Sequence, residues 1–248
     1  MEEIVRSVRG LKGYKMGDAE IQIMCYADHA ALIAEGEDDL QRLLHLFNLK
    51  AKSLNMEISP TKTKCLKTSK TPLRSQLELD GRVIEQKIKF NYLRVELSGF
   101  GDTEAEVRYQ ATKAIRIAGC LNAIWCNRRM GTDSKSRIYK IVVRPMMTYT
   151  AETRPETMKT KRLLETAEMK ILRRITGKTL LDRARSKDIR TACNVKNINE
   201  WVANRKKEWN EHISRMDHHR LVRIAREVHI GTKRRCAPGN DGATASRK

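Results

Sequence analysis

The segment Cys25-Tyr26-Ala27-Asp28-His29 holds the residues best suited to chemistry in this 248-residue chain. Apolar residues dominate both sides of it, from Ile21 to Ala34, and two apolar runs around a short polar break predict a β-hairpin. An aspartate at such a turn faces outward, and carboxylate oxygen is the ligand that hard divalent cations prefer. Taken alone, however, an aspartate at a hairpin turn is more often simply a turn residue.

The elements that must position this turn follow an α+β pattern. Apolar residues recur at helical spacing over residues 38–54, and acidic residues precede them, which predicts a helix with a favourable N-terminus. Residues 76–95 are predicted to form β-structure, in which Leu77–Ile84 alternates around Asp80-Gly81, a pair typical of a tight hairpin. The stretch from Phe90 to Val95 predicts the next strand.

From Thr103 onward the periodicity becomes helical. Thr103 and Glu106 have the spacing of a capping box. One apolar stripe then follows, consisting of Val107, Ala111, Ala114, Ala118, Leu121 and Trp125. Further helices are predicted near 134–143, 157–176, 185–193 and 197–217. Residues 228–248 have little apolar content, so we expect a disordered tail there.

The net charge of +20 is concentrated beyond residue 57. Residues 1–57 carry 7 Lys+Arg against 10 Asp+Glu, whereas residues 58–248 carry 43 against 20. Phosphate backbones are the commonest partner of such a basic chain, which indicates RNA or DNA. A well-solvated basic surface without a dedicated partner is the alternative.

The basic helices predicted around 157–178 and 196–226 are the best candidates for phosphate contacts without sequence readout. The cations expected to make these contacts are Arg173, Arg174, Lys178, Arg205, Lys206 and Lys207. Trp201 and Trp209 can stack on bases, but their helical spacing with apolar neighbours favours a place in the core.

Other patterns exclude several classes. The six cysteines form no CxxC pair and match no zinc signature. The N-terminus is acidic and lacks the apolar region of a signal peptide, and no apolar run approaches membrane-spanning length. We therefore expect an intracellular protein without a membrane partner. The sequence does not distinguish nucleus from cytoplasm and does not indicate an oligomeric state.

An ordered series of segments resembles the reverse transcriptases of non-LTR (LINE-type) retrotransposons. Tyr26-Ala-Asp-His and the following Glu37–Leu43 resemble the family's Tyr-Ala-Asp-Asp box and the helix after it. Leu54–Lys64 resembles the next palm motif, and Phe90-Asn-Tyr-Leu-Arg94 resembles a hairpin that grips the primer end. Segments including Arg137–Lys140 extend the resemblance to about residue 228.

The resemblance implies that the chain contains part of the fold of an RNA-directed DNA polymerase. Residues 1–95 would form a partial palm of a small antiparallel sheet plus a helix, residues 96–150 thumb-like helices, and residues 151–227 a basic helical linker region before the tail at 228–248. It also implies roles for three residues: Asp28 as a ligand of Mg²⁺, Tyr26 as a neighbour of the primer terminus, and Lys62 as the palm lysine near the departing pyrophosphate.

The sequence departs from the family where the chemistry is most demanding. His29 replaces the second acid of the box, Arg94 replaces a glycine of the hairpin, and Ser59 replaces an asparagine. No acid among the 27 residues before Asp28 lies in a context that resembles the family's upstream catalytic strand.

Two-metal nucleotidyl transfer needs several carboxylates, and a neutral imidazole favours softer metals than Mg²⁺. We therefore expect no productive Mg²⁺ binding and no polymerase activity in this chain alone. The alternatives are a non-catalytic RNA- or DNA-binding module and a decayed product that folds poorly.

Overall fold

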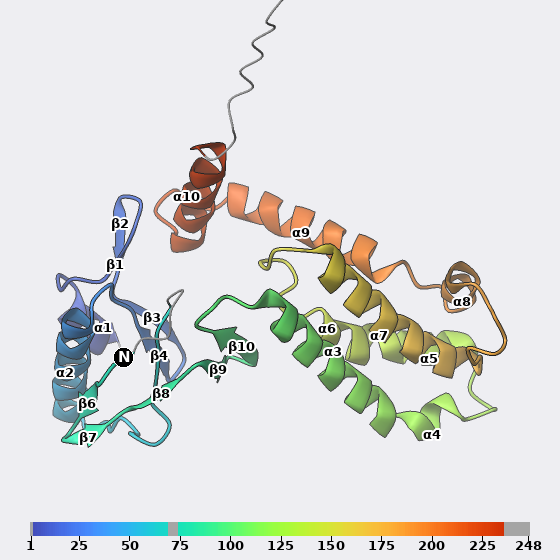
Figure 1. Cartoon of the computed structure of the whole chain (residues 1–248), viewed down its shortest axis with the longest axis horizontal. Helices are drawn as coiled ribbons and strands as arrows, with labels where there is room; N and C mark the ends of the chain where they lie inside the picture. The colour runs from blue at the N-terminus through green and yellow to red at the C-terminus, as the bar shows by residue number, and fades with distance from the viewer. Residues whose placement is uncertain (1, 69–73, 236–248) are drawn as a thin grey trace, which may run out of the picture. The chain divides into compact units, whose positions relative to one another are not determined.

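The computed structural model describes residues 2–68 and 74–235 and divides the chain into two compact units. Unit 1 comprises Met1–Cys65, Ser75–Glu85 and His212–Lys248, and unit 2 comprises Leu66–Arg74 and Gln86–Glu211. Helices and short two-stranded sheets make up both units, which confirms the α+β prediction (Figure 1). In the described part of the chain, no helix is both long and apolar enough to cross a membrane.

Unit 1 is built on two helices, α1 (Glu2–Val8) and α2 (Glu37–Ser53), which pack against each other. The helix predicted over 38–54 is thereby confirmed. Three acids in the first turn of α2 suit the positive end of the helix dipole. The main apolar cluster of the unit consists of Ile4, Val8, Leu43, Phe47 and Ala51.

Three antiparallel hairpins belong to unit 1: β1 (Tyr14–Met16) with β2 (Ala19–Ile21), β3 (Ile23–Tyr26) with β4 (His29–Leu32), and β6 (Glu78–Leu79) with β7 (Arg82–Val83). The second confirms the hairpin predicted around the acidic turn. In the third, Asp80 and Gly81 both have positive φ, as the Asp-Gly signal predicts. The strands β5 (Lys64–Leu66) and β8 (Glu85–Lys87) are also short.

A second small core lies beneath the Asp80-Gly81 hairpin and consists of Leu44, Cys65, Leu77, Leu79 and Ile84. The helix α10 (Leu221–Arg235) extends past residue 228, where we expected the tail to begin. Its apolar residues recur at helical spacing as far as Ile230, which the low overall apolar content of the tail obscured. The remaining tail residues, 236–248, lie outside the described residues.

Within Gln86–Glu211, unit 2 contains a hairpin followed by a helical bundle. The hairpin is formed by β9 (Lys89–Tyr92) and β10 (Val95–Ser98), which contradicts the single strand expected over Phe90–Val95. The helices are α3 (Thr103–Cys120), α4 (Asn122–Trp125), α5 (Thr132–Ile138), the π-helix η1 (Tyr139–Val143), α6 (Arg144–Met147), α7 (Met158–Thr176), α8 (Ser186–Ala192) and α9 (Ile198–Ser214).

The bundle packs around one continuous core. The alanines of the predicted stripe, Ala111, Ala114 and Ala118, are buried and let α3 and α7 lie side by side (Figure 1). The α3 stripe is interrupted at Leu121, because the helix ends at Cys120 before α4 brings Trp125 into the core. The predicted helix over 134–143 is confirmed in position but contains the π-helical turn.

The expected capping box of α3 is wrong. The N-cap is Asp102, whose carboxylate accepts hydrogen bonds from the backbone N–H groups of Glu104 and Ala105. Glu106 is buried instead, at 2.8 Å from Arg154. An aspartate is a strong N-cap, so Asp102 takes the position that the Thr-Glu spacing suggested for Thr103.

Candidate nucleic-acid interface and acidic turn

The acidic turn of unit 1 is a two-residue connection between β3 and β4. Tyr26 pairs with His29 across it, so that Ala27 and Asp28 form the loop. Ala27 has a φ of 53°, a left-handed conformation that costs energy for a residue with a Cβ atom. The side chain of Asp28 is 92% exposed, and its Oδ1 lies 3.9 Å from His29 Nε2. The turn therefore presents one carboxylate and one imidazole to solvent.

This arrangement does not fit a two-metal centre. Within residues 2–68 and 74–235, no three His, Cys, Asp or Glu side chains gather in a way that would hold a metal ion. Tyr26 is exposed at the same turn, and Lys62 is exposed in the loop before β5. Of the three predicted catalytic residues, Tyr26 and Asp28 thus share one turn, and no described contact joins Lys62 to it. Among the described residues, the turn itself brings together one carboxylate and one imidazole.

The β9–β10 turn in unit 2 is held by side chains from distant parts of the sequence. Leu93 and Arg94 both have positive φ, at 47° and 68°. The Tyr149 hydroxyl donates to the Leu93 carbonyl at 3.1 Å, and Gln110 Nε2 donates to the Arg94 carbonyl at 3.0 Å. Arg94, which replaces a glycine of the resembling hairpin, therefore adopts a left-handed conformation, and tertiary hydrogen bonds stabilise the turn.

The six cations predicted to contact phosphates belong to unit 2 but differ in availability. Arg174, Lys178 and Lys207 are exposed and form no ion pair within the described residues. Arg173 is half-buried, and its Nε lacks a hydrogen-bond partner within the described residues. Arg174, Lys178 and Lys207 are therefore accessible, and unpaired in the described part of the chain, as binding a phosphate requires.

Arg205 and Lys206 are committed to contacts within unit 2. Arg205 bonds to Glu152 and Glu208 at 3.3 and 3.0 Å. Lys206 Nζ donates to the Arg154 carbonyl at 2.8 Å and lies 3.5 Å from Glu156. Because these acids already neutralise them, the two cations contribute less to an anion-binding surface than the sequence suggested.

Trp201 takes the core position that its spacing favoured. Its ring packs against the central apolar cluster of unit 2. The guanidinium of Arg144 lies 4.7 Å from the ring centroid, and that of Arg205 lies at 5.9 Å. Cation–π contacts of this kind occupy the ring face, which leaves it poorly placed to stack on a base.

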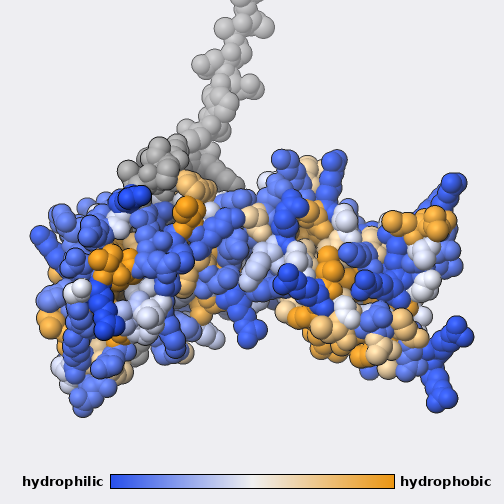
Figure 2. Space-filling model, turned by 60° about the horizontal axis from the view of Figure 1, so that its bottom comes forward, coloured by the Kyte–Doolittle hydropathy of each residue, from blue (hydrophilic) through white to orange (hydrophobic). Residues whose placement is uncertain are grey.

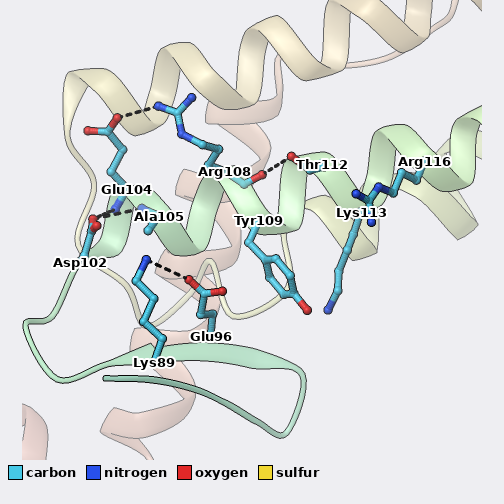
Figure 3. A pocket seen from close by; sticks show the side chains of 10 residues that line it. All are labelled: Lys89, Glu96, Asp102, Glu104, Ala105, Arg108, Tyr109, Thr112, Lys113 and Arg116. Atoms are coloured by element: carbon cyan, nitrogen blue, oxygen red, sulfur yellow. Dashed lines mark hydrogen bonds and ion pairs between the residues drawn. The ribbon is translucent and has the colours of Figure 1, made fainter. Parts of the chain in front are cut away.

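A groove lies between α3 and the β9–β10 hairpin (Figure 3). This groove was not predicted from the sequence. It has a volume of about 580 Å³. Its lining consists of Lys89, Glu96, Asp102, Glu104, Ala105, Arg108, Tyr109, Thr112, Lys113 and Arg116. Exposed polar residues spaced four apart on α3, Arg108, Thr112 and Arg116, were the signal that could have indicated it.

The groove contains more cations than its acids neutralise. Arg108 bonds to Glu104 at 2.9 Å, and Lys89 lies 3.5 Å from Glu96. Lys113 lies 4.1 Å from the centroid of the Tyr109 ring, and Arg116 is exposed without an ion pair in the described chain. As at Trp201, the cation–π contact occupies a face of the Tyr109 ring, so that Arg116 is the lining cation left exposed without an ion pair in the described residues.

A buried polar network fixes the helices beneath these surfaces. Glu168 is fully buried and bonds to Arg190 Nε at 2.9 Å, and it accepts from the Tyr139 hydroxyl at 3.4 Å. Burial raises the pKa of Glu168, and burial together with the nearby Glu168 charge raises the pKa of Tyr139. The network joins η1, α7 and α8, so it positions the basic helices from inside.

The exposed surface of the molecule is predominantly hydrophilic in the view of Figure 2, with apolar residues in small groups.

No model of a known protein family matches this chain, and no curated protein matches it.

Proposed function

We propose that this chain is a segment of a non-LTR retrotransposon reverse transcriptase that binds nucleic acid and, as an isolated chain, does not polymerise DNA. The observation that carries the proposal is the acidic turn. One exposed aspartate stands at a two-residue hairpin turn, with a histidine where the resembling family has its second acid. A hairpin in this place supports descent from a polymerase palm, and the single carboxylate argues against catalysis.

The positive-φ turn at Leu93 and Arg94 gives independent support. The resembling family has a glycine where this chain has Arg94, and glycine is the residue that tolerates this conformation best. Retention of the backbone conformation despite the substitution is what a changed descendant of that hairpin would display.

Primer extension on an RNA template tests the catalytic part of the proposal. The full chain is incubated with a primed template, nucleotides and Mg²⁺ or Mn²⁺, next to the His29→Asp variant. We expect no extension by either protein, because a second adjacent acid still falls short of the carboxylate set that two metal ions need. Sustained extension by the unmodified chain would refute the proposal, and extension by the variant alone would reveal a further carboxylate at the turn.

The charge of unit 2 supports the nucleic-acid binding in this proposal, which does not depend on descent from a polymerase. Residues 86–211 carry 28 Lys+Arg against 14 Asp+Glu. Their exposed members include Arg174, Lys178 and Lys207 and, in the α3 groove, Lys89, Arg108 and Arg116. Phosphate contacts of this kind give affinity without sequence preference.

Fluorescence anisotropy with labelled single-stranded RNA at several salt concentrations tests this binding. We expect affinity to fall steeply with salt and to be nearly equal for RNAs of different sequence. Affinity that does not change with salt, or no binding at all, would refute the binding function.

A further inference from the structure

The loop between α7 and α8 exposes two leucines at its tip. Leu180 is 77% exposed and Leu181 is 91% exposed. The loop bows outward from the helices that it connects (Figure 1). Single exposed apolar residues are common. Two adjacent leucines that are both highly exposed at a loop tip form a small apolar patch on the surface.

The tip is a preformed turn. The Thr179 backbone N–H and hydroxyl both donate to Asp182 Oδ2, at 2.5 and 2.9 Å, and the Arg183 N–H donates to the Leu180 carbonyl at 3.2 Å. These bonds lower the pKa of Asp182, chiefly through the Thr179 backbone N–H. The backbone that carries the leucines is therefore ordered before any partner arrives, so that little backbone entropy is lost on binding.

Both ends of the turn are anchored to the bundle. Gly177 ends α7 with a φ of 67°, and the Lys178 N–H donates to the Arg173 carbonyl at 2.9 Å. On the far side, Ala184 packs against the central core of unit 2. The exposed segment is consequently a short and rigid projection.

Cations surround the leucines in the sequence. Within residues 174–187, five exposed basic residues form no ion pair in the described part of the chain: Arg174, Lys178, Arg183, Arg185 and Lys187. The one acid of this stretch is Asp182, whose carboxylate accepts hydrogen bonds from Thr179, and the next acid along the chain is Asp188. The partner of this loop must therefore offer negative charge around an apolar interior.

The observations favour a nucleic acid over the other partners with such chemistry. A second copy of the chain would bring like charges together, and two leucines are far too small for a stable protein interface. Anionic membranes are usually bound by long amphipathic faces with aromatic residues. Nucleic acids, in contrast, accept small apolar wedges between unstacked bases while cations hold the flanking phosphates.

We propose that Leu180 and Leu181 form a wedge that inserts between bases where a duplex meets a single strand, with the five surrounding cations on the phosphates. The inference rests on the proposed nucleic-acid binding and adds a specific structure to it. A junction is the preferred target because its terminal bases are the easiest to unstack.

The test uses the full chain and a DNA duplex with a single-stranded overhang, in which 2-aminopurine replaces the base at the junction. Its fluorescence rises when the base is unstacked. We expect this rise on binding, together with a preference of about fivefold or more for the junction over a blunt duplex. The Leu180→Ala/Leu181→Ala variant should lose the rise and the preference but keep the salt dependence of binding.

The matched control replaces Ile141 and Met158 with alanine, because both are 68% exposed in the same unit. This control should retain the fluorescence rise. All three proteins should have the same helical circular dichroism and thermal transition, since none of the changed side chains is buried.

Each of the following results would overturn the wedge. Binding without a fluorescence rise, or a rise that the leucine variant retains, removes the wedge while leaving the proposed nucleic-acid binding in place. If the chain binds phosphatidylserine vesicles through the leucines and the fluorescence of the junction 2-aminopurine does not change, the loop tip binds a lipid surface instead. No binding to any nucleic acid refutes the proposed function and the wedge together.

Discussion

The two regions of this molecule that carry its candidate chemistry differ in charge and in the depth of their cores. Residues 1–65, which contain the acidic turn, carry 9 Lys+Arg against 10 Asp+Glu, whereas residues 86–211 carry 28 against 14. The first region packs around two small apolar clusters, and the second around one continuous core. The comparison assigns the proposed nucleic-acid binding to the helical unit and the proposed loss of catalysis to the acidic turn of unit 1.

The difference also appears in where polar groups are buried. In unit 2, the pairs Glu168–Arg190 and Glu106–Arg154 lie inside the bundle, with Glu168 fully buried. In unit 1, Asp28 and His29 lie in solvent. Charges buried in pairs are costly to break, so a change in unit 2 should affect folding and a change at the acidic turn should not.

The largest expected effect is on the stability of the helical unit. Glu168→Ala leaves the side chain of Arg190, which is 15% exposed, without its main partner, and we expect the free energy of unfolding to fall by about 3–5 kcal/mol. Asp28→Ala should change it by less than about 0.5 kcal/mol. Urea unfolding followed by circular dichroism measures both, and equal losses in the two variants would contradict the contrast.

The next effect concerns the salt dependence of RNA binding. Arg174→Ala/Lys178→Ala removes two free cations from unit 2, and we expect the slope of log affinity against log salt to become shallower by about 1.4 for a single strand. Lys12→Ala/Lys15→Ala removes two exposed cations from unit 1 and should leave the slope unchanged. Anisotropy titrations at four salt concentrations distinguish the two, and a larger change in the unit 1 variant would reverse the assignment.

A smaller effect is expected at the β9–β10 turn. Arg94→Gly removes the left-handed strain of a residue with a Cβ atom, so the free energy of unfolding should rise by up to about 1 kcal/mol after the entropy of the unfolded glycine is subtracted. Arg116→Gly, inside α3, should instead lower it by about 1 kcal/mol. Destabilisation by both substitutions would show that the Arg94 side chain makes contacts that outweigh the strain.

The smallest effect is a pH dependence at the Asp80-Gly81 hairpin. The hydrogen bond from Lys52, followed by that from Asn48, lowers the pKa of Asp80. The resulting stabilisation is complete above the unfolded pKa of about 3.9 and is lost as the pH falls through the lower folded value. Thermal melts of Asp80→Asn and the unmodified chain should therefore differ near neutral pH and converge in acid; a constant difference would contradict this linkage.

Much of the fold followed from local pattern. Helices α2 and α7 and the hairpins at the acidic turn and at Asp80-Gly81 lie where periodicity and turn residues predicted them. The β9–β10 turn did not follow from local pattern, because Leu93 and Arg94 lack the usual turn chemistry, although the family resemblance of Phe90–Arg94 implied a hairpin at this place. Tyr149 and Gln110 stabilise that turn from positions 56 and 16 residues away, and no local pattern carries that information.

The sequence predicted which residue types make up the candidate site, but it did not predict which of its cations are paired with acidic residues. The sequence placed Arg205 and Lys206 among the free cations, but Glu152 and Glu156, some fifty residues earlier, neutralise them. The α3 groove depends on Lys89 and Glu96 of a different element meeting the helix face. Whether a cation is available depends on partners that only the tertiary structure brings near it.

The most direct test of the central claim measures binding and extension in one sample. An RNA template annealed to a fluorescently labelled primer is saturated with the full chain, and anisotropy confirms the binding. Nucleotides and Mg²⁺ are then added. The account predicts a saturated, salt-sensitive complex in which the primer keeps its length. A primer that lengthens in the bound complex, or a template that stays unbound at low salt, would contradict it.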